Sequence, residues 1–225
     1  MAPPWPFSMW DMDVIGPISL KASNGHRFIF VVIDYFTKWV EATSYASVTQ
    51  SVICKFIKKE IICRYGIRKR IISDNATNLN NKMMDQLCEQ FKIKHHNSAP
   101  YRSKMNGVVE AVNKNVKKIV AKIMDTYKDW HEKLPFALHA YRTAVRTSTR
   151  ATLFSLVYGM EAVLLIEVEI PSLQVLMEAK LEEAEWVQAR YDQLNVIEEK
   201  KLKALYHGQL YQKWMMQAHD KKVHP

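Results

Sequence analysis

Three acidic residues occur where the sequence pattern changes between strand, helix and loop. Asp13 precedes the Gly16-Pro17 break, Asp74 ends a short apolar run, and Glu110 lies in the first turn of the clearest amphipathic helix pattern. Neighbouring strands in a sheet lie ~4.8 Å apart, so two strand-borne carboxylates can meet, and a helix packed over the sheet can supply a third. Carboxylates without His or Cys suit hard cations such as Mg²⁺ or Mn²⁺. The alternative for each acid alone is a solvated surface residue or a helix cap.

Cationic and amide side chains accompany Glu110 on the helix predicted from residue 106 or 107 to about 124. Such a surface can hold a metal at one end and bind a phosphodiester backbone along the rest. The alternative is an ordinary solvated helix with Glu110 and Lys114 as an i,i+4 pair. The preceding loop, residues 100–107, adds further polar groups that could close on a DNA end. The candidate DNA-binding residues are Asn113, Lys114, Lys117 and Lys118 on the helix and Tyr101, Arg102 and Lys104 in the loop.

The elements that position these residues alternate between short apolar runs and amphipathic stretches. Asn24-Gly25 predicts a hairpin turn between the first two strands. Residues 173 to about 217, rich in Glu, Lys, Gln and Ala, predict a long helical arm that serves as a connector or coiled-coil element. The order of elements favours an α/β fold. Strands are predicted over 12–15, 28–34, 39–43, 70–74 and 92–96, and helices over 48–65, 79–91 and 130–141.

Composition narrows the class of partner. The 225 residues carry 32 Lys and Arg against 23 Asp and Glu, a net charge of +9, which favours a polyanion but does not separate nucleic acid from an anionic membrane. No apolar run approaches the ~20 residues that span a bilayer, and the first residues lack a signal-peptide pattern. Three cysteines without C-x-x-C spacing favour neither disulfides nor a zinc site. We expect a soluble, intracellular protein.

Four linked motifs carry a resemblance to a known family. Asp74 and Glu110 have 35 residues between them, and with Asp13 they resemble the D,D-35-E triad of retroviral and retrotransposon integrases. The surrounding segments closely resemble the integrase core of plant gypsy-type long-terminal-repeat retrotransposons, from about Trp5 to the end of the chain. The motifs are residues 10–17 (WDMDVIGP), 33–42 (IDYFTKWVEA), 73–78 (SDNATN) and 101–111 (YRSKMNGVVEA).

This resemblance implies an RNase H-like fold, with a five-stranded mixed sheet flanked by helices and followed by a long helical arm. It implies a catalytic core over residues 1–165 and a helical connector over 166–225, without the family's zinc-binding amino-terminal and β-barrel carboxy-terminal domains. It selects Asp13 over Asp11 as the first metal ligand, and it makes Asp34 similar to a family acid that binds no metal. Asp13, Asp74 and Glu110 would be both the catalytic residues and the ligands of two Mg²⁺ (or Mn²⁺) ions.

The activity implied is that of a metal-dependent polynucleotidyl transferase, performing 3′-end processing and strand transfer of retroelement DNA. Its partners would be DNA at element ends and targets and further copies of the chain, with no membrane. It would act in the nucleus, although the sequence has no clear import signal, and otherwise be cytoplasmic. Two alternatives remain: an inactive or domesticated DNA-binding and assembly module, and a hydrolytic nuclease of the same fold. Arg150, Leu153 and Leu165 depart from the family pattern, where Gly, Pro and Pro are usual.

Overall fold

The computed structural model describes residues 6–19, 21–66, 70–73, 79–97, 114–115, 118–119, 121–122, 129–162 and 182–223. The chain divides into two compact units, Met1–Tyr141 and Arg142–Pro225. The predicted domain boundary at 165/166 lies outside the described residues. Within the described part, no helix combines the length and the apolar character that crossing a membrane requires.

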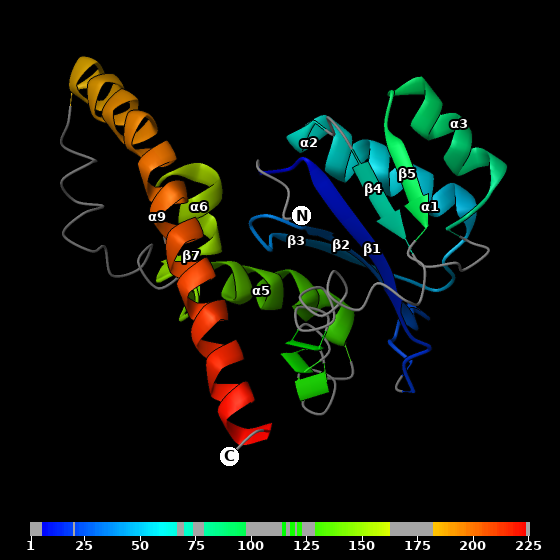
Figure 1. The fold of residues 1–225 in the computed structure, drawn as a ribbon. Coiled ribbons are helices and arrows are strands. Elements are labelled where there is room, and N and C mark those ends of the chain that lie inside the picture. The colour runs from blue at the N-terminus through cyan, green and yellow to red at the C-terminus, as the bar shows by residue number, and fades with distance from the viewer. Residues whose placement is uncertain are drawn as a thin grey trace. The chain divides into compact units, whose positions relative to one another are not determined.

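The first unit contains a mixed five-stranded sheet with the order β3-β2-β1-β4-β5 (Figure 1). Strands β1, β2 and β3 form an antiparallel meander, while β4 and β5 run parallel to β1. This confirms the predicted mixed sheet. The strands are β1 (Met9–Ile15), β2 (Phe28–Asp34), β3 (Val40–Tyr45), β4 (Arg70–Ser73) and β5 (Lys94–Asn97).

Strand β2 is buried on both faces, as its continuous apolar run predicts. The predicted Asn24-Gly25 turn lies in the β1–β2 connection, where the Gly25 N–H donates to the Ala22 carbonyl at 2.9 Å. Gly25 has φ +84°, which favours glycine. Gly16 is required by space, because a Cβ there would lie 2.7 Å from Cδ1 of Phe28.

The first unit contains three helical segments in addition to its sheet. The predicted helix 48–65 is a continuous helical segment of α1 (Gln50–Phe56), a π-helical stretch η1 (Ile57–Ile62) and α2 (Cys63–Tyr65). The Thr49 hydroxyl caps its start by accepting from the Val52 N–H. Helix α3 (Lys82–Gln90) packs against α1, and α5 (Trp130–Thr143) follows later in the chain. The predicted helices 48–65, 79–91 and 130–141 are therefore present, with boundaries shifted by a few residues.

The second unit contains a short hairpin and two helices packed together. Strands β6 (Val145–Arg146) and β7 (Ala151–Thr152) were not predicted, and α6 (Leu153–Tyr158) follows directly. Helix α9 (Glu183–Val223) confirms a long carboxy-terminal helix. It packs on α6 where Ile197 approaches Gly159, and its Arg190 donates to the Tyr158 carbonyl at 3.3 Å.

Arg150 adopts a left-handed backbone conformation at the end of the β6–β7 turn. Its φ is +53°, and its N–H donates to the Arg146 carbonyl at 2.7 Å. A side chain in this conformation costs about 1–2 kcal/mol, which glycine avoids. The glycine that the resembled family has at this position therefore fits the observed turn better than arginine does.

Candidate active site

Strand β1 gives the sheet two chemically different faces. Trp10 lies on the face covered by the α1–η1–α2 segment, since its ring centroid is 5.4 Å from that of Tyr65 in α2. Phe30 on β2 shares this face and meets Phe56 of α1 at 5.2 Å. Because side chains alternate along a strand, Asp11 and Asp13 point to the opposite face. We call these the α1 face and the acidic face.

Asp13 is half-buried on the acidic face and oriented by its own backbone. The N–H of Val14 donates to Oδ1 of Asp13 at 2.7 Å. Asp13 is paired with Val31 of the antiparallel neighbour β2. Strand β1 thus presents this carboxylate from a central position in the sheet, with parallel β4 on its other side.

The parallel register of β1 and β4 aligns Met12 with Ser73 and Asp11 with Ile72. Ser73 is the last residue of β4, and Asp74 follows it in the sequence. Asp74 and Glu110 both lie outside the described residues, so the structure brings neither of them together with Asp13. Of the three predicted metal ligands, Asp13 alone has a described position.

Two of the predicted DNA-binding residues have described positions. Lys114 and Lys118 are helical and exposed, one helical turn apart. Ile119 is half-buried next to exposed Lys118, in keeping with the predicted amphipathic helix. The other five, Asn113, Lys117, Tyr101, Arg102 and Lys104, lie outside the described residues.

A hydrogen bond between Ser73 and His95 ties the end of β4 to β5. The Ser73 Oγ lies 2.8 Å from Nε2 of His95, and Ser73 is fully buried. Burial lowers the pKa of His95, which favours the neutral ring. His95 and His96 are neighbours in β5, so strand alternation places their side chains on opposite faces. The partner of His95 was missed, because strand alternation indicates a side chain's face but not the register between strands.

Asp34 is a buried structural acid at the end of β2. One carboxylate oxygen accepts the Phe7 N–H at 2.9 Å, and the other accepts the Thr37 N–H and hydroxyl, both at 2.7 Å. Burial raises its pKa to about 6 despite these hydrogen bonds, and burial likewise lowers the pKa of Lys38 to about 8. With no exposed surface and three donors engaged, Asp34 serves the turn after β2 rather than a metal.

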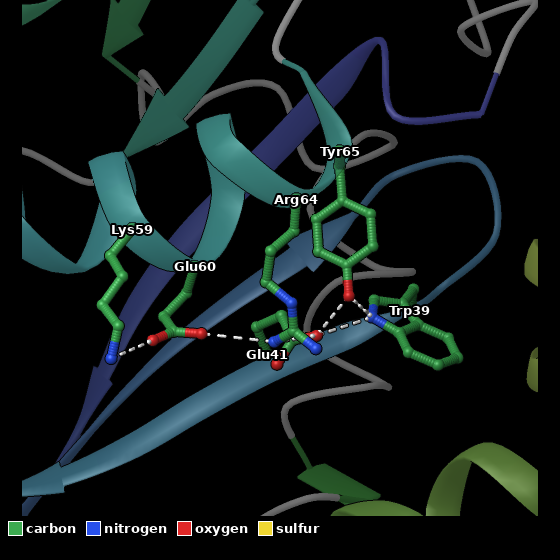
Figure 2. Close-up of polar contacts among 6 residues, drawn as sticks. All are labelled: Trp39, Glu41, Lys59, Glu60, Arg64 and Tyr65. Carbon is green, nitrogen blue, oxygen red and sulfur yellow. Dashed lines mark hydrogen bonds and ion pairs between the residues drawn. The ribbon is translucent and has the colours of Figure 1, made fainter.

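Figure 2 shows a second buried acid, Glu41 on β3, held by groups from the helical segment. Its carboxylate accepts from the Tyr65 hydroxyl and from the indole of Trp39 at 3.0 Å. Arg64 lies 3.6 Å from the same oxygen and also pairs with Glu60. This network joins the edge strand to α2 and gives Glu41 a structural role on the α1 face.

A groove of about 670 Å³ lies between the α1–η1 segment and α3. It opens on the helical layer of the α1 face, away from Asp13. Lysine and amide side chains line the groove, and a buried cysteine and a buried leucine form its floor. Because it opens on the α1 face, the groove is separate from the candidate metal site. The lining residues are Ser51, Cys54, Lys55, Lys58, Lys59, Cys63, Met83, Gln86, Leu87 and Gln90.

The chemistry of the predicted donor set fits a divalent metal ion. Among the described residues, no three His, Cys, Asp or Glu side chains gather as a metal site. Asp13, however, offers hard oxygen from a half-buried strand position, which suits Mg²⁺ or Mn²⁺. A complete site requires the two further carboxylates that the sequence predicts.

Comparison with known families assigns the amino-terminal part of the chain. Residues 3–103 match the family model described as "Integrase core domain". This part of the chain is similar to integrase core domains. Similar domains occur within longer polyproteins: the Gag-Pol polyprotein of Avian reticuloendotheliosis virus is 33% identical over 159 residues, which are 69% of this chain and 13% of that protein. The Pol polyprotein from transposon 412 of Drosophila melanogaster is 28% identical over 149 residues, 66% of this chain and 12% of that protein.

Solved structures of integrase catalytic cores share the fold. The catalytic core domain of BIV integrase superposes with a TM-score of 0.55 and 21% identity, covering 66% of this chain and 92% of that one. A chain of the simian T-cell lymphotropic virus intasome in complex with PP2A regulatory subunit B56 gamma gives a TM-score of 0.56 and 23% identity, covering 67% and 54%. The five-stranded mixed sheet with flanking helices is therefore the integrase-core fold.

Proposed function

We propose that this chain integrates DNA as a metal-dependent polynucleotidyl transferase, with Asp13, Asp74 and Glu110 as its carboxylate triad. The similarity of residues 3–103 to integrase core domains supports the class of reaction. The net charge of +9 supports a polyanionic substrate. We further propose that the substrate is the DNA of a gypsy-type, plant-like retrotransposon, on the strength of the four sequence motifs.

The observation that carries the proposal is the register between β1 and β4. Met12 pairs with Ser73, so a continuation of the same register by one residue would bring Asp13 level with Asp74. Ile72 shares the acidic face with Asp11, and if the alternation continued by one residue, Asp74 would share that face with Asp13. Asp11 is level with Ile72 instead, which favours Asp13 as the ligand.

Asp13, Asp74 and Glu110 would hold Mg²⁺ or Mn²⁺, which activates a water or 3′-hydroxyl nucleophile and stabilises the leaving oxygen. The half-buried position of Asp13 and the Val14 N–H bond fix its carboxylate in orientation before substrate binds. Exposed Lys114 and Lys118 would bind phosphates of the DNA backbone and so orient the scissile bond. Asn113, Lys117 and the loop residues Tyr101, Arg102 and Lys104 would extend that contact.

The domain and compartment proposals follow from the same resemblance. Residues 1–165 would form the catalytic core, and 166–225 would form the connector that contains α9. Integration into chromosomal DNA would take place in the nucleus, so we propose the nucleus as the site of action. Limited proteolysis, with mass spectrometry of the products, tests the boundary near residue 165, and imaging of the tagged chain tests the compartment.

A strand-transfer assay tests the proposed function. The full chain is incubated with Mg²⁺ or Mn²⁺ and a labelled duplex with a free 3′-hydroxyl, next to Asp13→Asn and Asp74→Asn. Asp11→Asn is the matched control, because it removes a charge from the same strand and the same face. We expect joined products from wild type and Asp11→Asn, and a loss of at least about 100-fold in the other two variants.

Each other outcome has a defined meaning. Cleavage without joining would replace the transferase by a hydrolytic nuclease. DNA binding without chemistry in the wild type would leave a DNA-binding module. Equal loss in Asp11→Asn and Asp13→Asn would contradict the assignment drawn from the β1–β4 register.

A further inference from the structure

Helix α9 separates its charges into two halves. Residues 183–199 contain five acids and a single Arg, a net charge of −4, and residues 200–217 contain four Lys and no acid, a net charge of +4. The macrodipole of a helix favours acids and bases only within its first and last turns. It does not explain a separation that extends over a helix about 60 Å long.

Large apolar side chains are exposed along both halves of α9. They include both tryptophans of the helix, Trp186 at 52% and Trp214 at 60% exposure, and two tyrosines at similar values. Isolated exposed apolar residues are ordinary, but a dense series along one helix marks an interaction surface. The full set is Trp186, Val187, Tyr191, Leu194, Val196, Leu202, Tyr206, Leu210, Tyr211, Trp214, Met215 and Met216.

Contacts within the second unit occupy a separate set of α9 residues. Arg190 and Lys200 reach the carbonyls of Tyr158 and Gly159, and Ile197 packs on Gly159. At the junction of the halves, Lys203 pairs with Glu199 at 2.6 Å. The exposed apolar residues and the outer charges of each half remain available to a partner.

We propose that α9 binds α9 of a second copy of this chain in antiparallel orientation. This arrangement sets the acidic half of each helix against the basic half of the other, whereas parallel pairing would oppose like charges. Centred near residue 200, it brings Trp186 level along the helix axis with Trp214 of the partner. The interface is then isologous, with each contact made twice across a two-fold axis.

The proposal goes beyond the proposed function and does not rest on it, because association is measured without DNA or metal. The partner of α9 is a second copy of the same helix, because its two halves, with net charges of −4 and +4, are complementary to each other. Two-fold repetition doubles each favourable contact. It also makes the association dependent on salt, since exposed charges are screened.

A charge-reversal experiment on the full chain tests the pairing. The first variant carries Glu185→Lys and Asp192→Lys in the acidic half, and the second carries Lys203→Glu and Lys213→Glu in the basic half. Sedimentation velocity at low salt should show dimers for wild type and at least about tenfold weaker association for each variant alone. An equimolar mixture of the two variants should recover part of the association, because the +4 half of the first variant then meets the −4 half of the second, whereas neither variant alone can form such a contact.

Photocrosslinking gives an independent readout that needs no charge change. Trp186→p-benzoylphenylalanine is mixed with isotopically labelled chain and irradiated, and the linked peptides are identified by mass spectrometry. We expect a link between copies at the peptide that contains Trp214. A monomeric wild type, a mixture of variants that stays apart, or a link between copies at the peptide around residue 186 would each overturn the proposal.

Discussion

The Ser73–His95 hydrogen bond should contribute measurably to the stability of the sheet beside the proposed site. His95→Phe keeps a ring but leaves the fully buried Ser73 Oγ without its partner, and among the described residues that oxygen has no other. An unsatisfied buried hydroxyl costs about 1–3 kcal/mol. Ser73→Ala should cost less, about 1 kcal/mol, because His95 is half-buried and can reach water.

A double-mutant cycle isolates the bond. Removing both partners should cost less than the sum of the two single changes, with a coupling of about 0.5–1.5 kcal/mol. Hydrogen exchange of the β4 and β5 amides is the assay, because it reports local free energy in a chain with two units. His96→Phe is the matched control, since exposed His96 is the next residue of β5 on its other face, and should change stability by less than about 0.5 kcal/mol.

Two results would refute this reasoning. A coupling near zero would show that the 2.8 Å contact carries no net stability. An effect of His96→Phe as large as that of His95→Phe would show that β5 responds to any change of side chain. The second result would also show that the Ser73–His95 hydrogen bond does not specifically tie the end of β4 to β5.

Three further predictions concern the turn, the buried acid and the basic helix. Arg150→Gly should raise stability by about 0.5–1 kcal/mol, because φ is +53°, and urea denaturation that shows a loss would contradict this. Burial raises the pKa of Asp34 from 3.8 to about 6, so the folded state keeps a proton that the unfolded chain releases. Stability from this group is therefore greatest below pH 3.8 and falls by up to about 3 kcal/mol as the pH rises to 6, and a carboxyl pKa below 3.8 by NMR titration would reverse the sign. Replacing both Lys114 and Lys118 by Ala should lower the slope of log affinity for DNA against log salt concentration by the amount expected for about two phosphate contacts. An unchanged slope in a titration by fluorescence anisotropy would exclude these contacts.

Local sequence pattern predicted the elements that have a clear period. The apolar run 28–34 is strand β2 with the predicted bounds, and the apolar spacing through Ile53 and Ile57 is helical. The first strand begins earlier than predicted, at Met9, and the alternation of buried Trp10 and Met12 with Asp11 and Asp13 is the period-two signal that the predicted start at residue 12 left out. The π-helical stretch keeps the same apolar stripe as an α-helix, so no residue pattern distinguished it.

Features that depend on contacts between distant residues could not be predicted in the same way. Strands β6 and β7 have two residues each, which is too short for any alternation to be recognised. The burial of Glu41 could not be predicted, because it depends on contacts with Tyr65 and Arg64, which lie more than 20 residues later in the chain. Asp13 was predicted through the family resemblance, and its preference over Asp11 stays a prediction because Asp74 lies outside the described residues.

The most direct test of the central claim is a crystal structure of the chain soaked in Mn²⁺, with anomalous scattering used to locate the metal. The account predicts an anomalous peak about 2.1 Å from carboxylate oxygens of both Asp13 and Asp74, with Glu110 completing the site. Saturating Mn²⁺ that leaves Asp13 without metal, or a peak held by Asp11 instead, would contradict it.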